Sequence, residues 1–295
     1  MKLKGYLFGC VSSATYGLIP LFALPMLRRG IALDSVLFYR FACAAALIGL
    51  TTALRRESLR ITRHEAPVLA GLGLLFAMSA RFLFWSYDYM DVGIASTLLF
   101  LYPVFVALMM ALFFRERIPW AARIAIGLAF GGVFLLYGAD GARPVTPFGV
   151  TIVMLSALSY ALYMVVVNKS CVSRMPGSRL TFYALAFSAL FFGIKARLGG
   201  GIQPLPDLKA VSDSLLLALI PTVVSCVTMV YAVHCVGSTV TAVLGAMEPL
   251  TAVSVGVLVF GETLTGTLLA GITLIVGAVT LIIRVDATRK KHAPI

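Results

Sequence analysis

The two halves of the chain carry a proline and a glutamate at the same spacing. Pro103 and Glu116 are thirteen positions apart in the first half, and Pro249 and Glu262 are thirteen positions apart in the second. Each proline lies within an apolar run, and each glutamate stands where that run ends. Two copies of one apolar module, with helix breakers at corresponding positions, are typical of secondary transporters built from internal repeats.

The apolar content of the chain predicts a membrane protein. Hydrophobic residues make up 60% of the sequence and charged residues only 12%, whereas a soluble domain has about 25% charged residues. The apolar residues form about ten stretches of roughly 20 residues, which is the length that crosses a ~30 Å hydrocarbon core. They lie near residues 5–27, 34–54, 66–88, 92–114, 119–138, 147–167, 179–198, 212–234, 238–260 and 263–283. We therefore expect an all-α membrane protein with ten transmembrane helices.

The first stretch follows two lysines, as the core of a signal peptide would. It is longer than a usual signal-peptide core, and no sizeable soluble domain follows it. We expect it to be retained as the first helix.

Positive charges predict the orientation of these helices. With ten crossings both termini lie on one side of the membrane, and sixteen Lys and Arg residues fall in the segments on that side, against six on the other. This bias predicts cytoplasmic termini and, for a cell with two membranes, the inner membrane. The net charge of +12 is thus an orientation signal, because no basic stripe with interleaved aromatic residues predicts a nucleic-acid surface.

The two halves are predicted to be inverted repeats. Five helices per half mean that the second half begins on the opposite side of the membrane from the first. Glycine, charged residues and two prolines interrupt the apolar pattern near Gly138–Pro147. We therefore divide the chain into a first repeat, residues 1–140 with helices one to five, and a second repeat, residues 141–295 with helices six to ten and a basic cytoplasmic tail.

These features together resemble the drug/metabolite transporter superfamily, and most closely its EamA-type exporters. The resemblance rests on the helix count, the five-plus-five repeat, the proline and glutamate spacing, and the Phe-Tyr-Arg-Phe sequence at residues 38–41. It covers the chain from about Gly5 to Ile283. The family implies a substrate cavity between the two halves and alternating access, and its substrates range from amino acids to drugs and other metabolites.

Charged side chains deep in the apolar segments are the first candidates for function, because each costs about 2.5–3.5 kcal/mol at a helix centre. Glu248 lies near the middle of the ninth helix, and Arg81 lies somewhat outward of the middle of the third. They could pair and lock the two helices together, or they could line a wet cavity and bind substrate or a proton. Burial favours the neutral form of a lone glutamate, whereas pairing with Arg81 would favour the charged form. We favour the functional interpretation, because apolar pairs often stabilise as well as a buried ion pair does.

Three other charged residues are assigned structural or gating roles. Arg40 stands about two turns into the second helix, near the outer boundary, from where it could reach headgroups or helix-end carbonyls. The resemblance to the family also implies an arginine at this place. Glu116 and Glu262 each stand between two helices, where a carboxylate can accept hydrogen bonds from free backbone N–H groups.

Helix breakers and small residues predict hinges and close crossings. Pro20, Pro103 and Pro249 each interrupt an apolar helix and free backbone carbonyls, which is consistent with a cavity and with hinges. Gly127 and Gly131 are four positions apart on the fifth helix, and we expect them to pack within the bundle rather than to form a dimer face.

Aromatic residues gather at helical spacing around the buried charges. On the third helix, Met78, Arg81 and Trp85 share one face, and on the sixth helix Tyr160 and Tyr163 do the same. A buried hydroxyl group needs a partner, so tyrosines inside the hydrocarbon depth point toward a polar interior, although ordinary packing between helices is the alternative. The predicted substrate-binding or coupling set is Glu248, Arg81, Tyr16, Met78, Trp85, Tyr102, Tyr160, Tyr163 and Tyr231.

The sequence favours export of small metabolites, such as amino acids or similar amphiphiles, with Arg81 on a carboxylate and Glu248 on an amine or a coupling proton. Uptake or facilitated exchange is the alternative within transport, and a membrane enzyme or scaffold subunit is the alternative outside it. No nucleophile motif, Walker-type loop or metal-ligand cluster is present, and the five scattered cysteines read as inert thiols, so we expect no enzyme, no cofactor and no metal. The expected partners are a small-molecule substrate, the lipid bilayer and, if transport is coupled, protons, for a monomer or homodimer.

Overall fold

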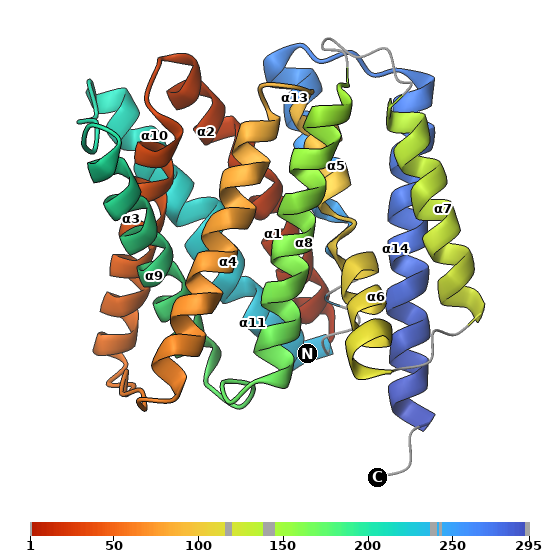
Figure 1. The fold of residues 1–295 in the computed structure, drawn as a ribbon, viewed down its shortest axis with the longest axis horizontal. Coiled ribbons are helices and arrows are strands. Elements are labelled where there is room, and N and C mark those ends of the chain that lie inside the picture. The colour runs from red at the N-terminus through yellow and green to blue at the C-terminus, as the bar shows by residue number, and fades with distance from the viewer. Residues whose placement is uncertain (1, 116–119, 138–144, 237–240, 242–243, 293–295) are drawn as a thin grey trace.

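The computed structural model describes residues 2–115, 120–137, 145–236, 241 and 244–292, and in this part of the chain every regular element is a helix. The helices run side by side between two ends, called here the upper and the lower end as they appear in Figure 1. Eight helical segments are long and apolar enough to cross a membrane. Two shorter apolar helices, Arg123–Leu136 and Met247–Phe260, run beside them. The predicted all-α membrane fold is confirmed.

The first half of the chain starts at the lower end (Figure 1), and its described helices make five crossings. Two of its crossings are divided into consecutive helices. Its elements are α1 (Lys2–Gly17), α2 (Ile19–Arg28), α3 (Leu33–Leu54), α4 (Glu65–Ser86), α5 (Val92–Leu99), α6 (Tyr102–Phe114) and α7 (Trp120–Tyr137).

The second half starts at the upper end with α8, so it runs in the inverted direction (Figure 1). Its third crossing contains a π-helix between two α-helices. Its elements are α8 (Pro147–Lys169), α9 (Gly177–Leu198), α10 (Leu208–Ala218), η1 (Leu219–Val224), α11 (Ser225–Val236), α13 (Met247–Phe260) and α14 (Gly266–His292).

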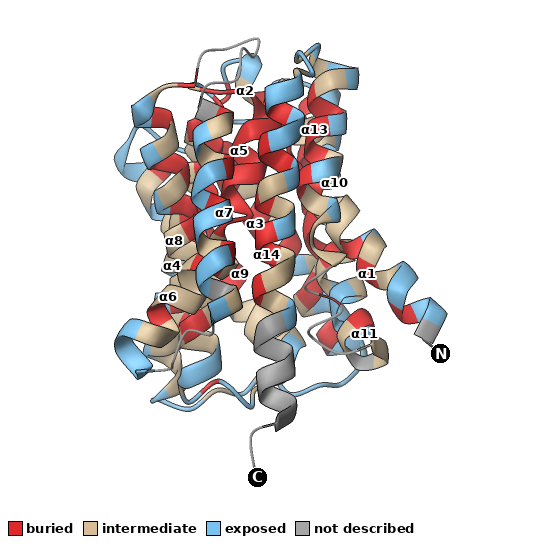
Figure 2. Cartoon of the chain, turned by 90° about the vertical axis from the view of Figure 1, so that its right-hand side faces the viewer, coloured by how far each residue is buried: buried red, intermediate tan, exposed pale blue. Residues whose placement is uncertain are grey.

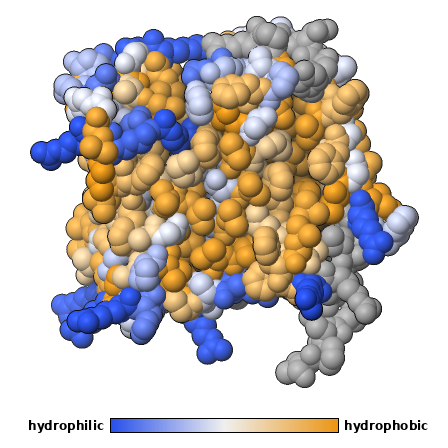
Figure 3. Space-filling model, viewed as in Figure 1, coloured by the Kyte–Doolittle hydropathy of each residue, from blue (hydrophilic) through white to orange (hydrophobic). Residues whose placement is uncertain are grey.

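The outer surface is the one that a bilayer requires. Figure 3 shows an apolar band across the middle of the face in view, with hydrophilic residues gathered toward the two ends. Large apolar side chains are exposed on the surface, among them Leu112 at 75%, Phe134 at 78% and Leu258 at 83%. Hydrocarbon tails solvate such side chains as well as a protein core does.

Several helices begin where the sequence supplies a cap. At the lower end of α4, the backbone N–H of Thr62 donates to the carboxylate of Glu65 at 2.7 Å, and the Glu65 N–H donates to the Thr62 hydroxyl at 3.3 Å. This reciprocal pair is a capping box. At the upper end, Thr146 caps α8 and Asp207 caps α10 by accepting a backbone N–H three residues on.

The two ends of the bundle differ in packing. Every residue of α5 is buried, whereas α6, its continuation toward the lower end, has only Val104 and Met109 buried. Figure 2 shows the same contrast, with buried residues concentrated in the upper half around α5. The upper half is therefore closely packed between the repeats, and the lower half is packed more loosely.

The last helices of the two repeats, α7 and α14, cross through a pair of glycines. A methyl group at Gly132 would lie 2.6 Å from Cγ1 of Ile275, and one at Gly271 would lie 3.1 Å from the carbonyl oxygen of Gly132. Gly127 and Gly131 instead face open space and are exposed. The expectation that these two pack within the bundle is wrong, because the next residue, Gly132, lies on the buried face of α7.

We expect Gly132→Ala to destabilise the protein by about 1–3 kcal/mol, because the added methyl group overpacks this crossing. Gly131→Ala is the matched control. It adds the same methyl group to the same helix in open space and should be neutral or stabilising by up to about 1 kcal/mol through helix propensity. Unfolding in mixed micelles measures both, and equal effects would contradict the glycine crossing.

Candidate functional site

Membrane-crossing helices are interrupted at four places within the described part of the bundle. α1 ends at Gly17 and α2 begins at Ile19; α5 ends at Leu99 and α6 begins at Tyr102. The other two are the π-helix η1 and the turn that precedes α13. Such breaks are tolerated at membrane depth only where protein or water satisfies the freed backbone groups.

Prolines stand at the start of the helices that follow these breaks. Pro20 lies in the first turn of α2 and Pro103 in the first turn of α6. Pro249 is the third residue of α13, and Pro221 lies inside η1. The first turn of a helix tolerates proline because its N–H groups have no partner within the helix. The prolines therefore set where each half-helix begins.

Glu248 stands in the first turn of α13 rather than in the middle of a continuous helix. It is half-buried and forms no ion pair with a described residue. It acts electrostatically on tyrosines that come from both repeats, which are Tyr16, Tyr87, Tyr102 and Tyr160. A carboxyl group thus lies among phenolic hydroxyl groups within the bundle.

A close helix crossing brings Tyr16 to Glu248. A methyl group at Gly17 would lie 2.5 Å from the carbonyl oxygen of Glu248 and 2.8 Å from Cβ of Thr251. Only glycine lets the backbones of α1 and α13 approach so closely. The preceding residue, Tyr16, is thereby held beside Glu248.

Tyr102, Tyr160 and Tyr163 belong to one aromatic cluster between the repeats. The rings of Tyr102 and Tyr160 are 4.7 Å apart and perpendicular, and those of Tyr160 and Tyr163 are 5.9 Å apart and stacked. Phe76 on α4 joins the cluster at 5.5 Å from Tyr163. Edge-to-face and offset stacking of this kind fixes ring positions beyond simple area burial.

Arg40 lies in the interior, not near the outer boundary as the sequence suggested. It is 1% exposed, and its Nε donates to Oγ1 of Thr222 at 3.2 Å. Its guanidinium carbon lies 5.3 Å and 5.7 Å from the ring centroids of Phe41 and Phe84. The expectation that Arg40 reaches lipid headgroups is wrong, because η1 of the second repeat covers it. The π-type turn, in which Thr222 donates to the Leu217 carbonyl, aims this threonine at α3.

Arg81 is paired with Asp34, not with Glu248. The Asp34 carboxylate at the start of α3 also accepts a hydrogen bond from Lys195 Nζ at 3.1 Å. The three side chains are 25–33% exposed and join α3, α4 and α9 at the upper end. The pairing of Arg81 with Glu248 that we considered is therefore not present, because Asp34 provides a nearer carboxylate.

Three further residues of the predicted substrate-binding set lie apart from Glu248 and from the tyrosines described above. Trp85 packs edge-on against Phe148 near the upper end, with ring centroids 5.7 Å apart. Met78 is half-buried on α4. Tyr231 is 44% exposed on α11, and its ring lies 5.6 Å from that of Phe8 on α1.

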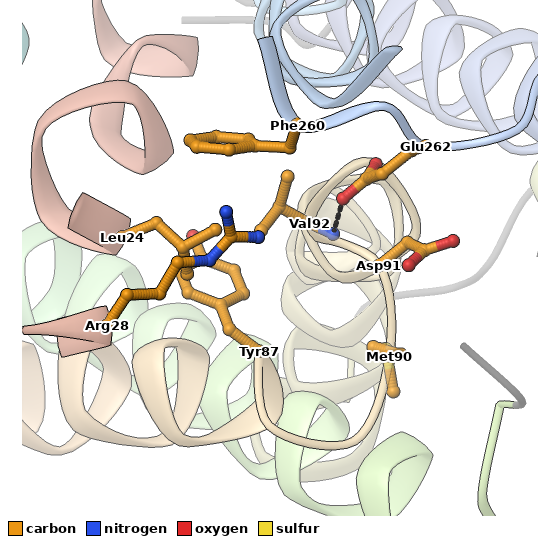
Figure 4. Close-up of a pocket in the computed structure, with 8 residues that line it drawn as sticks. All are labelled: Leu24, Arg28, Tyr87, Met90, Asp91, Val92, Phe260 and Glu262. Atoms are coloured by element: carbon orange, nitrogen blue, oxygen red, sulfur yellow. Dashed lines mark hydrogen bonds between the residues drawn. The ribbon is translucent and has the colours of Figure 1, made fainter. Parts of the chain in front are cut away.

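Glu262 binds the start of α5 in the other repeat. Its carboxylate accepts the backbone N–H groups of Val92 at 2.7 Å and Gly93 at 3.2 Å, which places a negative charge at a helix N-terminus. It borders a cavity of about 70 Å³ in which the guanidinium of Arg28 lies between the rings of Phe260 and Tyr87 (Figure 4). The cavity is lined by Leu24, Arg28, Tyr87, Met90, Asp91, Val92, Phe260 and Glu262. Glu116 lies outside the described residues.

Sequence reasoning missed several residues of the interior. Tyr87 at the end of α4, Thr222 in η1 and Cys226 on α11 all interact with Arg40. The proline at position 221 was the only signal for the π-helix, and nothing in the sequence showed that η1 would face α3.

Comparisons with known proteins agree with this architecture. The model of the EamA-like transporter family matches residues 3–138 and again residues 147–284. An uncharacterized transporter of Archaeoglobus fulgidus is 26% identical over 83% of the chain and 86% of its own length. An uncharacterized transporter of Synechocystis is 30% identical over 72% of the chain and 65% of its own length. A solved crystal structure is similar in fold, with a TM-score of 0.67 and 17% identity over 99% of this chain and all of that one.

We expect Thr222→Val to destabilise the protein by about 1–3 kcal/mol, because the isosteric change leaves the Arg40 Nε and the Leu217 carbonyl without this partner. Thr228→Val is the matched control, since the Thr228 hydroxyl bonds only to carbonyls of its own helical segment, those of Val224 and Ser225. It should cost about 0.5 kcal/mol or less. Unfolding of both variants in mixed micelles measures the difference, and equal losses would show that the contact between α3 and η1 contributes nothing.

Proposed function

The chain belongs to the EamA-like transporter family and carries the family domain twice, and from this premise we propose that it exports small amphiphilic solutes, such as amino acids, by alternating access. The central group of Tyr16, Tyr102, Tyr160, Tyr163 and Glu248 binds the solute between the two repeats. Each repeat contributes side chains to this group, so movement of one repeat against the other changes access to it.

The observation that carries this proposal is the position of Glu248. It stands within the bundle without an ion partner among the described residues, in the first turn of a half-helix and beside tyrosines of α1, α4, α6 and α8. A membrane protein that needed only packing would gain nothing from such a carboxyl group. Its role is to hold a solute amine or a coupling proton.

The contacts at the upper end support the alternating-access part of the proposal, because they join one repeat to the other. Glu262 binds the N-terminus of α5, Asp34 binds Lys195, and Arg29 binds Asp207 at 3.0 Å. Partly exposed ion pairs are worth about 0–1 kcal/mol each, so a modest rearrangement can break them. We propose that they form a gate that is closed in this structure, with the loosely packed lower half as the open side. Pro20, Pro103 and Pro249 act as hinges, and we assign Glu116 the equivalent gating role at the lower end.

Export follows the resemblance to EamA-type exporters, and uptake or facilitated exchange is the second candidate. Flux of labelled amino acids and amphiphilic drugs in proteoliposomes, with the gradient imposed in each direction and with or without a pH difference, decides among them.

We predict that the lower end is cytoplasmic, in the inner membrane of a cell with two membranes, from the sixteen-to-six split of positive charges. Reporter fusions at residues 140 and 205 should then report the outer side, and a fusion at residue 60 should report the cytoplasm. The reverse pattern would overturn the orientation and would place the closed gate on the cytoplasmic side.

We predict that Glu248→Gln lowers solute flux roughly tenfold or more, because a charged hydrogen bond or a proton carrier is lost, and that the remaining flux no longer depends on pH. Folding should be no worse, since the amide is nearly isosteric and removes a costly charge. The phenols of Tyr16, Tyr87, Tyr102 and Tyr160 interact electrostatically with this carboxyl group.

Glu57→Gln is the control for this experiment, because the Glu57 side chain is exposed and accepts a hydrogen bond from the Ser178 hydroxyl near the lower end. It should leave the flux and its pH dependence unchanged. Normal, pH-dependent flux in Glu248→Gln would reduce Glu248 to a packing residue.

A further inference from the structure

We propose that Arg40 is an oxyanion-binding subsite of the central group, and that it makes the protein select solutes that carry a carboxylate. This inference rests on the proposed transport function and adds to it the residue that determines which solutes are accepted. It replaces Arg81, which the sequence had suggested for this role.

The first step is that Arg40 is a buried cation without a carboxylate partner. It is 1% exposed, and its Nη2 atom is buried without a hydrogen bond. The ionisable groups that act on it are Tyr16, Tyr87 and Cys226, and none of these described residues is a carboxylate. Arg81, in contrast, already pairs with Asp34. A guanidinium held in the interior without a fixed counter-charge is able to receive a negative group from a solute.

The second step is that the guanidinium is held in place by Thr222 and by a side-chain hydrogen bond with Tyr16, while its Nη2 atom has no hydrogen bond to a described residue. Nε donates to Thr222, which the π-helix aims toward α3, and the rings of Phe41 and Phe84 lie beside the guanidinium plane. A planar guanidinium presents parallel N–H groups that match the two oxygens of a carboxylate. Fixing the group before binding reduces the ordering cost when a solute arrives.

The third step is the arrangement of opposite charges around Tyr16. This tyrosine interacts electrostatically with both Arg40 and Glu248. Arg40 and Glu248 form no ion pair with each other among the described residues. A solute with a carboxylate and an amine could therefore place the carboxylate at Arg40 and the amine at Glu248.

A purely structural role for Arg40 leads to a different expectation. If Arg40 only tied α3 to η1, its loss would weaken the protein and lower the flux of every solute by the same factor. If it binds an oxyanion, its loss should lower the flux of carboxylates and spare solutes that lack one.

The test measures flux in proteoliposomes for three probes that share a benzyl group: L-phenylalanine, L-phenylalaninamide and 3-phenylpropionate. For the wild-type protein, the two carboxylates should move at least tenfold faster than the amide. Arg40→Gln should lower the flux of both carboxylates tenfold or more and change the amide less than twofold. Arg81→Gln is the matched control, and it should keep the preference for carboxylates.

Arg40→Lys keeps the positive charge but not the planar guanidinium, and it replaces Arg40→Gln in this test if Arg40→Gln does not fold. It should retain a preference for carboxylates that is several-fold smaller than that of the wild type. Equal loss of all three probes in either variant would overturn the proposal, as would a wild-type protein that moves the amide as fast as the acids. If the wild-type protein moves the amide as fast as the acids, the preference for carboxylates is contradicted but the proposed transport function stands. Absence of flux for these probes and for the amino acids and drugs above, under every gradient, would overturn the proposed function as well.

Discussion

Backbone groups cannot stay unpaired inside a bilayer, and the interior of this protein depends on how its interrupted helices meet that constraint. The crossings that contain α1 and α2, α5 and α6, and η1 all break within the bundle, and α13 begins there. The freed backbone groups of each break must be satisfied by protein or by water. Gly17 at the end of α1 lies close to the backbone of Glu248 at the start of α13. The break between α1 and α2 and the break before α13 therefore cover each other, and Tyr16 and Glu248 are brought together as a consequence.

Charge placement follows a simple division between the interior and the upper end. At the upper end, Arg81 and Lys195 share the single carboxylate of Asp34, and partial exposure makes these ion pairs weak and reversible. Arg40 and Glu248 in the interior have no such partners among the described residues. Because an isolated interior charge is costly, its retention without a partner is the strongest physical argument that the solute provides one.

The asymmetry between the ends connects these features to movement. Hydrogen bonds and ion pairs between the repeats, such as Glu262 with Val92 and Arg29 with Asp207, accompany close packing around α5 at the upper end. The lower half of the same crossing, α6, is mostly unburied. Closely packed interfaces switch between discrete arrangements rather than deforming gradually, which is the behaviour that alternating access requires.

The sequence by itself determined the helical membrane fold, the ten apolar stretches, the repeat and the position of each break, because hydropathy, length and proline are local properties. It also marked Glu248 and the tyrosines as unusual. It could not determine partners: only Glu248 was considered as a carboxylate partner of Arg81, and the packing of α3 against α4 selected Asp34 instead. The sequence gives the depth of Arg40 along its helix but does not show that η1 covers it, and Arg40 was therefore expected near the membrane boundary. The π-helix that aims Thr222 at Arg40 depends on packing between the two repeats, and contacts so distant in sequence are decided only in the tertiary structure.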